Sequence, residues 1–248
     1  SLSDEVGGHV SDYIGHKRAM DYIHQADDIY LSFGASKTVH GLNNSRVDEI
    51  AYEASRYNIR LVPCPVRHLG TENAGPVLGA MHDYLVTKTN TTFLELTSAE
   101  DILCEEGKVT GVKIHQRGHE PEIVYAPYVV TAPGRGGAQW LSETVSKLGL
   151  RTQNNEVDIG VRVEVPNAIM DHLTRDLYEA KLVYYSDTYE NKVRTFCMNP
   201  GGLVSEEHYD GHIAVVNGHS YADDSRHTEN TNFAMLVSTK FTEPFDQP

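Results

Sequence analysis

The chain has 248 residues, which is enough for a sizeable hydrophobic core and near the size at which one domain tends to become two. Its formal net charge of −14 argues against binding to nucleic acids or anionic membranes, because both need a basic surface. No stretch approaches about 18 consecutive apolar residues, and the first residues lack the charged and apolar regions of a signal peptide. The three cysteines form no CxxC motif, and their odd number fits a reducing compartment better than a set of disulfides. We therefore expect a protein of the cytoplasm.

The first third of the chain is predicted to be mainly helical. Apolar residues at helical spacing predict helices over residues 17–31 and 45–57, and a third helix that begins at Thr71. Between the second and third helices, residues 59–62 predict a short strand that ends at two prolines, since proline lacks the N–H that a strand donates.

Short apolar runs separated by polar turns predict a β-meander in the middle of the chain. The runs are residues 92–96, 102–104, 109–114 and 123–125.

A strand, a glycine turn and a helix are predicted next, over residues 128–148. The apolar run 128–130 leads through Thr131-Ala132-Pro133-Gly134 and two further glycines into apolar residues at helical spacing. Glycine lets a ligand approach the backbone and a helix N-terminus offers free N–H groups, so the turn fits the cofactor edge of a parallel sheet. A turn that merely ends a strand and begins a helix explains the same residues.

The pattern changes after residue 150, where strand-like runs dominate. These runs are residues 157–165, 178–185, 193–198, 213–216 and 233–238, with one short helix predicted within 166–173. We therefore predict an α+β protein with two lobes: residues 1–150 as an α/β lobe and residues 151–248 as a mainly β lobe.

Several stretches resemble known flavoproteins. The segments FLELTSAEDIL, KVTGVKI and EIVYAPYVVTAPG, within residues 93–134, resemble the end of a FAD-binding domain of the glutathione-reductase type. Four further stretches together resemble the FAD-dependent, or NAD(FAD)-utilising, dehydrogenases. They are RHLGT (67–71), VDIGVRVEVP (157–166), TFCMNPGG (195–202) and VVNGHSY (215–221).

This resemblance implies a partial, Rossmann-like FAD-binding lobe over residues 1–150 and an inserted substrate lobe over 151–248. It implies FAD as cofactor, a small-molecule substrate and a flavin-dependent dehydrogenase activity. The cofactor contacts that it implies are Ala99 beside the adenine, Thr131, Ala132 and Gly134 near the ribose and pyrophosphate, and Gly201 and Gly202 near the flavin ring.

The chain also departs from the family pattern. It contains no GxGxxG, the turn that admits a dinucleotide pyrophosphate at a helix N-terminus, and no second flavin segment follows the last strand-like run. Asn199 stands where the family more often has a second cysteine, which argues against a redox dithiol. We therefore interpret the chain as a central fragment of a flavoprotein. By itself it is expected to be inactive and to bind FAD weakly or not at all.

Two residues are candidates for catalysis. Cys197 lies where a strand meets a Pro-Gly-Gly turn, either beside a flavin or as a small buried hydrophobe. A reactive thiolate needs a cationic neighbour, and the sequence offers Arg162, Arg194, His208 and His212. Arg162 alternates with valines, so it faces either an anionic substrate or flavin, or simply solvent. The loop 217–220 is either a ligand-facing loop or a plain turn.

Other chemistries find little support in the sequence. His115 and His119 have no third ligand at metal-site spacing, so no metal site is expected, and no GxSxG motif is present. The rival to the flavoprotein hypothesis is a non-enzymatic ligand-binding or assembly module. The composition does not predict the oligomeric state.

Overall fold

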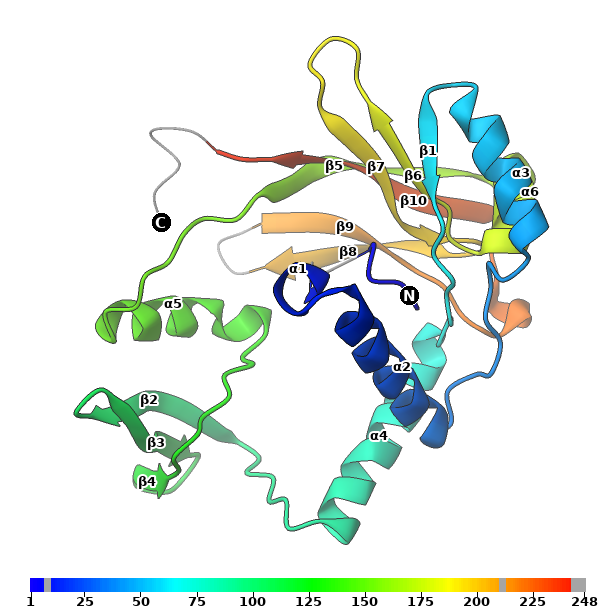
Figure 1. Ribbon diagram of the computed structural model, residues 1–248. Helices are drawn as coiled ribbons and strands as arrows, with labels where there is room; N and C mark the ends of the chain where they lie inside the picture. Colours follow the sequence, from blue (N-terminus) through cyan, green and yellow to red (C-terminus); the bar gives the residue numbers. More distant parts are fainter. Residues whose placement is uncertain (7–9, 210–212, 242–248) are drawn as a thin grey trace. The chain divides into compact units, whose positions relative to one another are not determined.

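The computed structural model describes residues 1–6, 10–209 and 213–241 (Figure 1). The described residues form two compact units. The large unit comprises residues 1–83 and 156–241, and the small unit comprises residues 84–155. Because these units reflect compactness alone, the division into lobes at residue 150 stays a prediction.

The large unit is built on a five-stranded antiparallel sheet with the order β1-β6-β7-β10-β5. The strands are β1 (Ile59–Val62), β5 (Val157–Pro166), β6 (Lys181–Tyr185), β7 (Lys192–Asn199) and β10 (Asn230–Thr239). Strand β10 pairs along its whole length with β5, which therefore forms one edge of the sheet. Its pairing with β7 shifts register between Asn232 and Ala234.

The large unit also contains helices, two of which contribute side chains to its hydrophobic core together with the sheet. The helices are α1 (Val10–Ile14), α2 (His16–Ser32), α3 (Asn44–Ser55), α6 (Asn167–Leu177) and the first part of α4 (Thr71–Lys88). Helices α3 and α6 lie side by side, with α3 in contact with β1 and α6 in contact with β5 and β10 (Figure 1). The core consists of Val47, Ile50, Leu61, Met170, Leu177, Ala180 and Met198. Met198, near the end of β7, joins this core directly beside Cys197 and Asn199 in the sequence.

A separate two-stranded antiparallel sheet consists of β8 (Leu203–Tyr209) and β9 (Ile213–His219). Strand β8 lies beside β10, and β9 lies beside β7. A short 3₁₀ helix, Asp224–Arg226, then connects β9 to β10.

The small unit contains the predicted β-meander, with one correction: the first predicted run, residues 92–96, forms no strand. Leu96 has a positive φ of 54°, which does not fit a β-strand. Strands β2 (Thr97–Glu105), β3 (Lys108–Gln116) and β4 (Glu122–Tyr125) pair in antiparallel order. The glycine turn forms a 3₁₀ turn, Arg135–Gly137, that leads into α5 (Ala138–Lys147). The indole Nε1 of Trp140 donates to the carbonyl oxygen of Glu100 at 3.2 Å, which attaches α5 to β2.

The predicted α+β class is confirmed, whereas a Rossmann-like lobe is not shown. Every strand pair among the described residues is antiparallel, so the sheet contains no parallel pair. The predicted strand at 128–130 is wrong: these residues join no sheet, and Tyr128 and Val130 are 88% and 91% exposed. An apolar run becomes a strand only beside a partner strand, and the described part of the small unit offers it none.

Among the described residues, none of the helices combines the length and the apolar character needed to cross a membrane.

Candidate functional site

Three of the four family-like stretches meet in one polar group, which we call the motif cluster: Arg162, Cys197, Asn199, Gly218 and Asn232. Arg162 comes from β5, Cys197 and Asn199 from the end of β7, and Gly218 from β9. The Nη1 atom of Arg162 donates to the carbonyl oxygen of Cys197 at 3.2 Å and to Oδ1 of Asn232 at 2.6 Å. Segments separated by up to 70 positions therefore form one site.

Strand register places these side chains. Arg162 on β5 lies opposite Ala234 on β10, and Asn232 on β10 lies opposite Asn199 on β7. The register shift between Asn232 and Ala234 occurs at this point, and Cys197 within it has a positive φ of 47°. Such backbone conformations are costly for residues other than glycine, and they concentrate at functional sites.

In the described part of the chain, the motif cluster contains two buried hydrogen-bond donors without partners. Nδ2 of Asn199 donates to the same two oxygens as Arg162, at 2.7 Å to Cys197 and 3.3 Å to Asn232. Among the described atoms, Nε of Arg162 and Nδ2 of Asn232 are buried and have no hydrogen-bond partner. Since buried N–H groups are nearly always bonded, the cluster suits a group that brings acceptors.

Glycines allow this close packing. A Cβ atom at Gly218 would overlap polar atoms of Arg162, Asn199 and Asn232. A Cβ at Gly202 would lie 2.6 Å from both the Cβ of Asn199 and the carbonyl oxygen of His219. Both positions therefore require glycine for steric reasons.

The N–H groups of Gly201 and Gly202 have partners within the chain. Gly201 donates to Oδ1 of Asn167 at 3.2 Å, and Gly202 donates to the carbonyl oxygen of Asn199 at 3.2 Å. Gly201 also has a positive φ of 60°. The predicted contact of these glycines with a flavin stays a prediction, and their N–H groups hold the turn in place.

The thiol of Cys197 lies among neutral groups. Its Sγ atom is 3.5 Å from Nδ2 of Asn199 and 3.9 Å from the carbonyl oxygen of Gly218. Of the predicted cationic neighbours, Arg162 contacts the Cys197 carbonyl, Arg194 pairs with Asp158 and His208 lies near Glu206. His212 lies outside the described residues.

The fourth family-like stretch, RHLGT, meets the end of VVNGHSY beside the motif cluster. The hydroxyl of Tyr178 and that of Ser220 are 2.5 Å apart, and Nε2 of His68 is 3.4 Å from the Ser220 hydroxyl. The His68 ring stacks on Tyr178 with centroids 4.5 Å apart, and Thr71 Oγ1 donates to the Ser220 carbonyl at 3.0 Å. We call His68, Tyr178 and Ser220 the tyrosine triad.

Burial shifts the ionisation of the triad. It raises the pKa of Tyr178 to about 12, so the phenol remains protonated near neutral pH. Burial also lowers the pKa of His68, which favours the neutral ring. Tyr178 has a positive φ of 60° as well, a second strained backbone position in this region.

Sequence reasoning missed Asn232 and Tyr178. Asn232 is fully buried, yet it lies in an ordinary strand pattern, and its role depends on pairing with residues far away in the chain. Tyr178 was assigned to a strand, whereas it follows the last residue of α6. A polar residue at an inward position of a β-strand was the available signal for Asn232.

The predicted FAD contacts Ala99, Thr131, Ala132 and Gly134 belong to the small unit. Ala99 lies in β2 opposite Ile114, and Thr131, Ala132 and Gly134 are exposed in a segment without helix or strand. Gly134 has a positive φ of 63°, and nothing lies within 4 Å of the position of its missing Cβ. A ligand can therefore approach the backbone at Gly134, although these contacts stay predictions.

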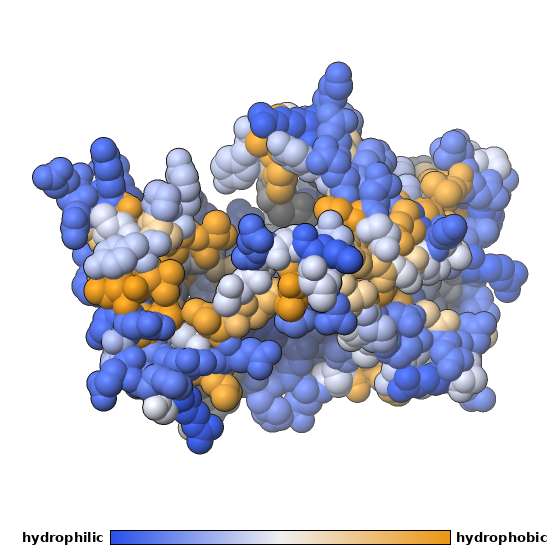
Figure 2. Space-filling view, turned by 90° about the horizontal axis from the view of Figure 1, so that it is seen from below, coloured by the Kyte–Doolittle hydropathy of each residue, from blue (hydrophilic) through white to orange (hydrophobic). Residues whose placement is uncertain are grey.

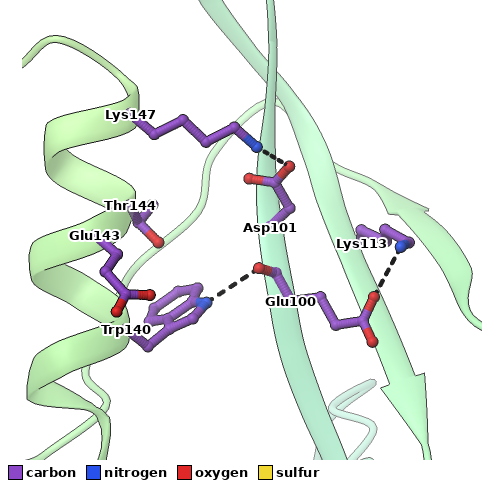
Figure 3. Close-up of a pocket in the computed structure, with 7 residues that line it drawn as sticks. All are labelled: Glu100, Asp101, Lys113, Trp140, Glu143, Thr144 and Lys147. Atoms are coloured by element: carbon purple, nitrogen blue, oxygen red, sulfur yellow. Dashed lines mark hydrogen bonds and ion pairs between the residues drawn. The ribbon is translucent and has the colours of Figure 1, made fainter.

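A cavity of about 270 Å³ between α5 and β2 is lined mainly by charged side chains that pair with one another (Figure 3). Lys147 pairs with Asp101 and Lys113 pairs with Glu100, the latter at 2.8 Å. These hydrogen bonds lower the pKa of Asp101 and of Glu100. Because Glu143 adds a third carboxylate to two lysines, the cavity does not suit a phosphate group.

No three His, Cys, Asp or Glu side chains come together as a metal site among the described residues. For His115, one of the two histidines weighed as metal ligands, Nδ1 lies 3.3 Å from Oε1 of Glu100.

The segment that contains the motif cluster is similar to a known protein family. Residues 156–247 match the family described as FAD-dependent protein, C-terminal domain-like. This segment is a C-terminal domain like that of FAD-dependent proteins. It contains Arg162, Cys197, Asn199, Gly218 and Asn232, the whole motif cluster. A comparison with curated proteins finds no similar sequence.

Proposed function

We propose that this chain is part of a flavin-dependent oxidoreductase, a dehydrogenase that acts on a small-molecule substrate. One observation carries the proposal: the motif cluster lies entirely within the segment that is like the C-terminal domain of FAD-dependent proteins. A buried group of donors in such a domain is better explained by a ligand than by packing, because an apolar core would be more stable there.

The residues of the motif cluster fit a flavin or a substrate held beside it. The carbonyl oxygens of a flavin ring accept hydrogen bonds, and Arg162 Nε and Asn232 Nδ2 are donors without partners. The open backbone side at Gly134 likewise fits a close ligand approach. When bound, FAD supplies the electron transfer, while protein groups orient the reactants and exclude water.

The chain's own residues would then divide the work. Arg162 and Asn232 would orient acceptor groups, and Ala99, Thr131, Ala132 and Gly134 would hold the adenosine and pyrophosphate. The protonated hydroxyl of Tyr178, which bonds to Ser220, would hold a proton at the edge of the site.

The affinity of the 248 residues for FAD tests one part of this proposal. Because they contain no GxGxxG, titration with FAD should give weak quenching of flavin fluorescence without a stoichiometric end point. Tight, stoichiometric binding would show that the chain needs no such turn.

The flavoprotein assignment has its own test. A protein that contains this chain together with a strand–GxGxxG–helix segment should purify yellow, with flavin absorbance. Colourless protein that stays free of flavin after addition of FAD would refute the assignment.

A non-enzymatic assembly module is the second candidate, and exposed side chains favour it. Val157, Ile159 and Val161 of edge strand β5 are 43%, 52% and 63% exposed, and Met235 opposite Val161 is 42% exposed. Hydrophobic residues also interrupt the mainly hydrophilic face seen in Figure 2. This candidate would be favoured if light scattering showed that the chain forms a stable complex, and if neither the chain nor a longer protein that contains it bound flavin.

A third possibility makes Cys197 a nucleophile without flavin. Iodoacetamide labelling at pH 7, followed by peptide mass spectrometry, compares Cys197 with the exposed Cys104 in the same molecule. Labelling of Cys197 slower than that of Cys104 would exclude an activated thiolate.

A further inference from the structure

Three cationic side chains are half-buried among the described residues of the five-stranded sheet: Arg162, Lys181 and Arg194. Lys181 pairs with Glu179, and Nη2 of Arg194 lies 2.5 Å from Oδ2 of Asp158. Arg162 differs from both. Its partners in the described chain are two neutral oxygens, the Cys197 carbonyl and Oδ1 of Asn232.

A cation withdrawn from water needs an anionic partner or a full set of acceptors. The guanidinium group has five N–H donors, and Nε of Arg162 has no acceptor at all. Leaving a charge so poorly compensated is destabilising, so a structural role alone does not explain Arg162.

The groups around Arg162 add donors rather than negative charge. Nδ2 of Asn199 and Nδ2 of Asn232 are both donors, and no carboxylate lies within ion-pair distance of Arg162 among the described residues. Gly218 also lies against Arg162, because a Cβ there would overlap the Nη1 atom, and glycine adds no charged side chain. Among the described residues, Arg162 is therefore left without an anionic partner.

Geometry narrows the class of anion. A guanidinium binds planar two-oxygen groups through two parallel N–H bonds, which a lysine cannot do. Nη1 of Arg162 is already bonded within the motif cluster, so an incoming group would use the remaining N–H donors.

We propose that Arg162 binds a carboxylate, with Nδ2 of Asn232 as the neighbouring donor. That this carboxylate belongs to the substrate rests on the proposed function; the anion site itself does not. The chain would then act on an organic acid, and Arg162 would set its orientation.

Thermal unfolding of the 248-residue chain tests this site without any flavin. Sodium acetate should raise the unfolding midpoint above that in sodium chloride of equal ionic strength. The increase should saturate, and it should be about 3–6 °C at a tenfold excess of acetate over its dissociation constant. Arg162→Gln should abolish the difference. Arg194→Gln is the matched control, because Arg194 already has a carboxylate partner, and it should keep the full response.

Two further arms decide the chemistry. Arg162→Lys keeps the positive charge but cannot bind a carboxylate through two parallel N–H bonds, so the variant should lose most of the acetate response. A full acetate response in Arg162→Lys would overturn bidentate recognition. Inorganic phosphate should stabilise the wild-type chain less than acetate, and the reverse order would assign the site to a phosphate instead. An acetate response that is equal in wild type and Arg162→Gln would overturn the proposal, even if the flavoprotein assignment holds.

Discussion

The large and the small unit differ in how they are held together. The large unit has a connected core in which Val47, Ile50 and Leu61 are 7%, 2% and 6% exposed. In the described small unit, Ile114 on β3 is the one buried hydrophobic side chain. Strand β4 of the same unit is exposed along its whole length. Hydrophobic burial is the main stabilising term in folding, so the motif cluster rests on the firmer scaffold.

This difference has a functional consequence. Arg162 and Asn232 are fixed by sheet register and a packed core, as a preorganised site requires. The predicted dinucleotide contacts at Thr131, Ala132 and Gly134 lie in an exposed segment of the less packed unit. We therefore expect substrate recognition to survive changes that disturb the dinucleotide contacts.

The largest effect should come from the core of the large unit. Ile50→Ala should lower the free energy of unfolding by about 2–5 kcal/mol, because it removes a buried side chain from the contact between α3 and the sheet. Urea denaturation followed by circular dichroism measures the loss. Tyr52→Ala on the same helix is the control, since Tyr52 is 71% exposed and should change stability by about 0.5 kcal/mol or less.

Hydrogen exchange should separate the two units. Amides of β4 in the small unit should exchange at least about tenfold faster than those of β10, because few apolar contacts protect them. Mass spectrometry of peptic peptides provides the comparison. Equal protection of the two strands would mean that the small unit is stabilised by more than its described contacts.

Acid should weaken the large unit through two half-buried histidines. Burial lowers the pKa of His68 and of His40 below the usual value of 6.5, so the unfolded chain binds protons that the folded rings do not. Their contribution is present above that usual value and is lost as the pH falls below it. The urea midpoint should decrease from pH 7 towards pH 5, and less so in His68→Gln. His172→Gln, at an exposed position of α6, should follow the wild-type profile.

The smallest effect is expected at the surface of the small unit. Lys147→Met removes the ion pair with Asp101, whose two side chains are 63% and 28% exposed. Exposed pairs contribute about 0–1 kcal/mol and are screened by salt, so the loss should be small and vanish at high ionic strength. A loss comparable to that of Ile50→Ala would show that the pair, and not burial, holds α5 in place.

Local patterns predicted α2 to α6 and the three strands of the meander, but not α1, because the apolar periodicity of the predicted elements is contained in short stretches. Apolar spacing located α2 and α3, and alternation located β3. The run 128–130 shows the limit of this reasoning, since nothing in an apolar run identifies a partner strand. The motif stretches likewise indicated Arg162 and Cys197, but not their partner Asn232, which only the pairing of β10 with β5 and β7 brings to them.

The stability of Arg162→Met, measured beside Arg194→Met without any added carboxylate, tests most directly whether the motif cluster is a ligand site. Asn199 continues to donate to both oxygens that Arg162 would release, so no acceptor is stranded. If Arg162 is present for a ligand, its replacement should leave the free energy of unfolding unchanged or raise it, whereas Arg194→Met should lose about 0.2–1 kcal/mol with its ion pair. A loss of about 3–5 kcal/mol in Arg162→Met would instead mark a structural arginine and contradict the account.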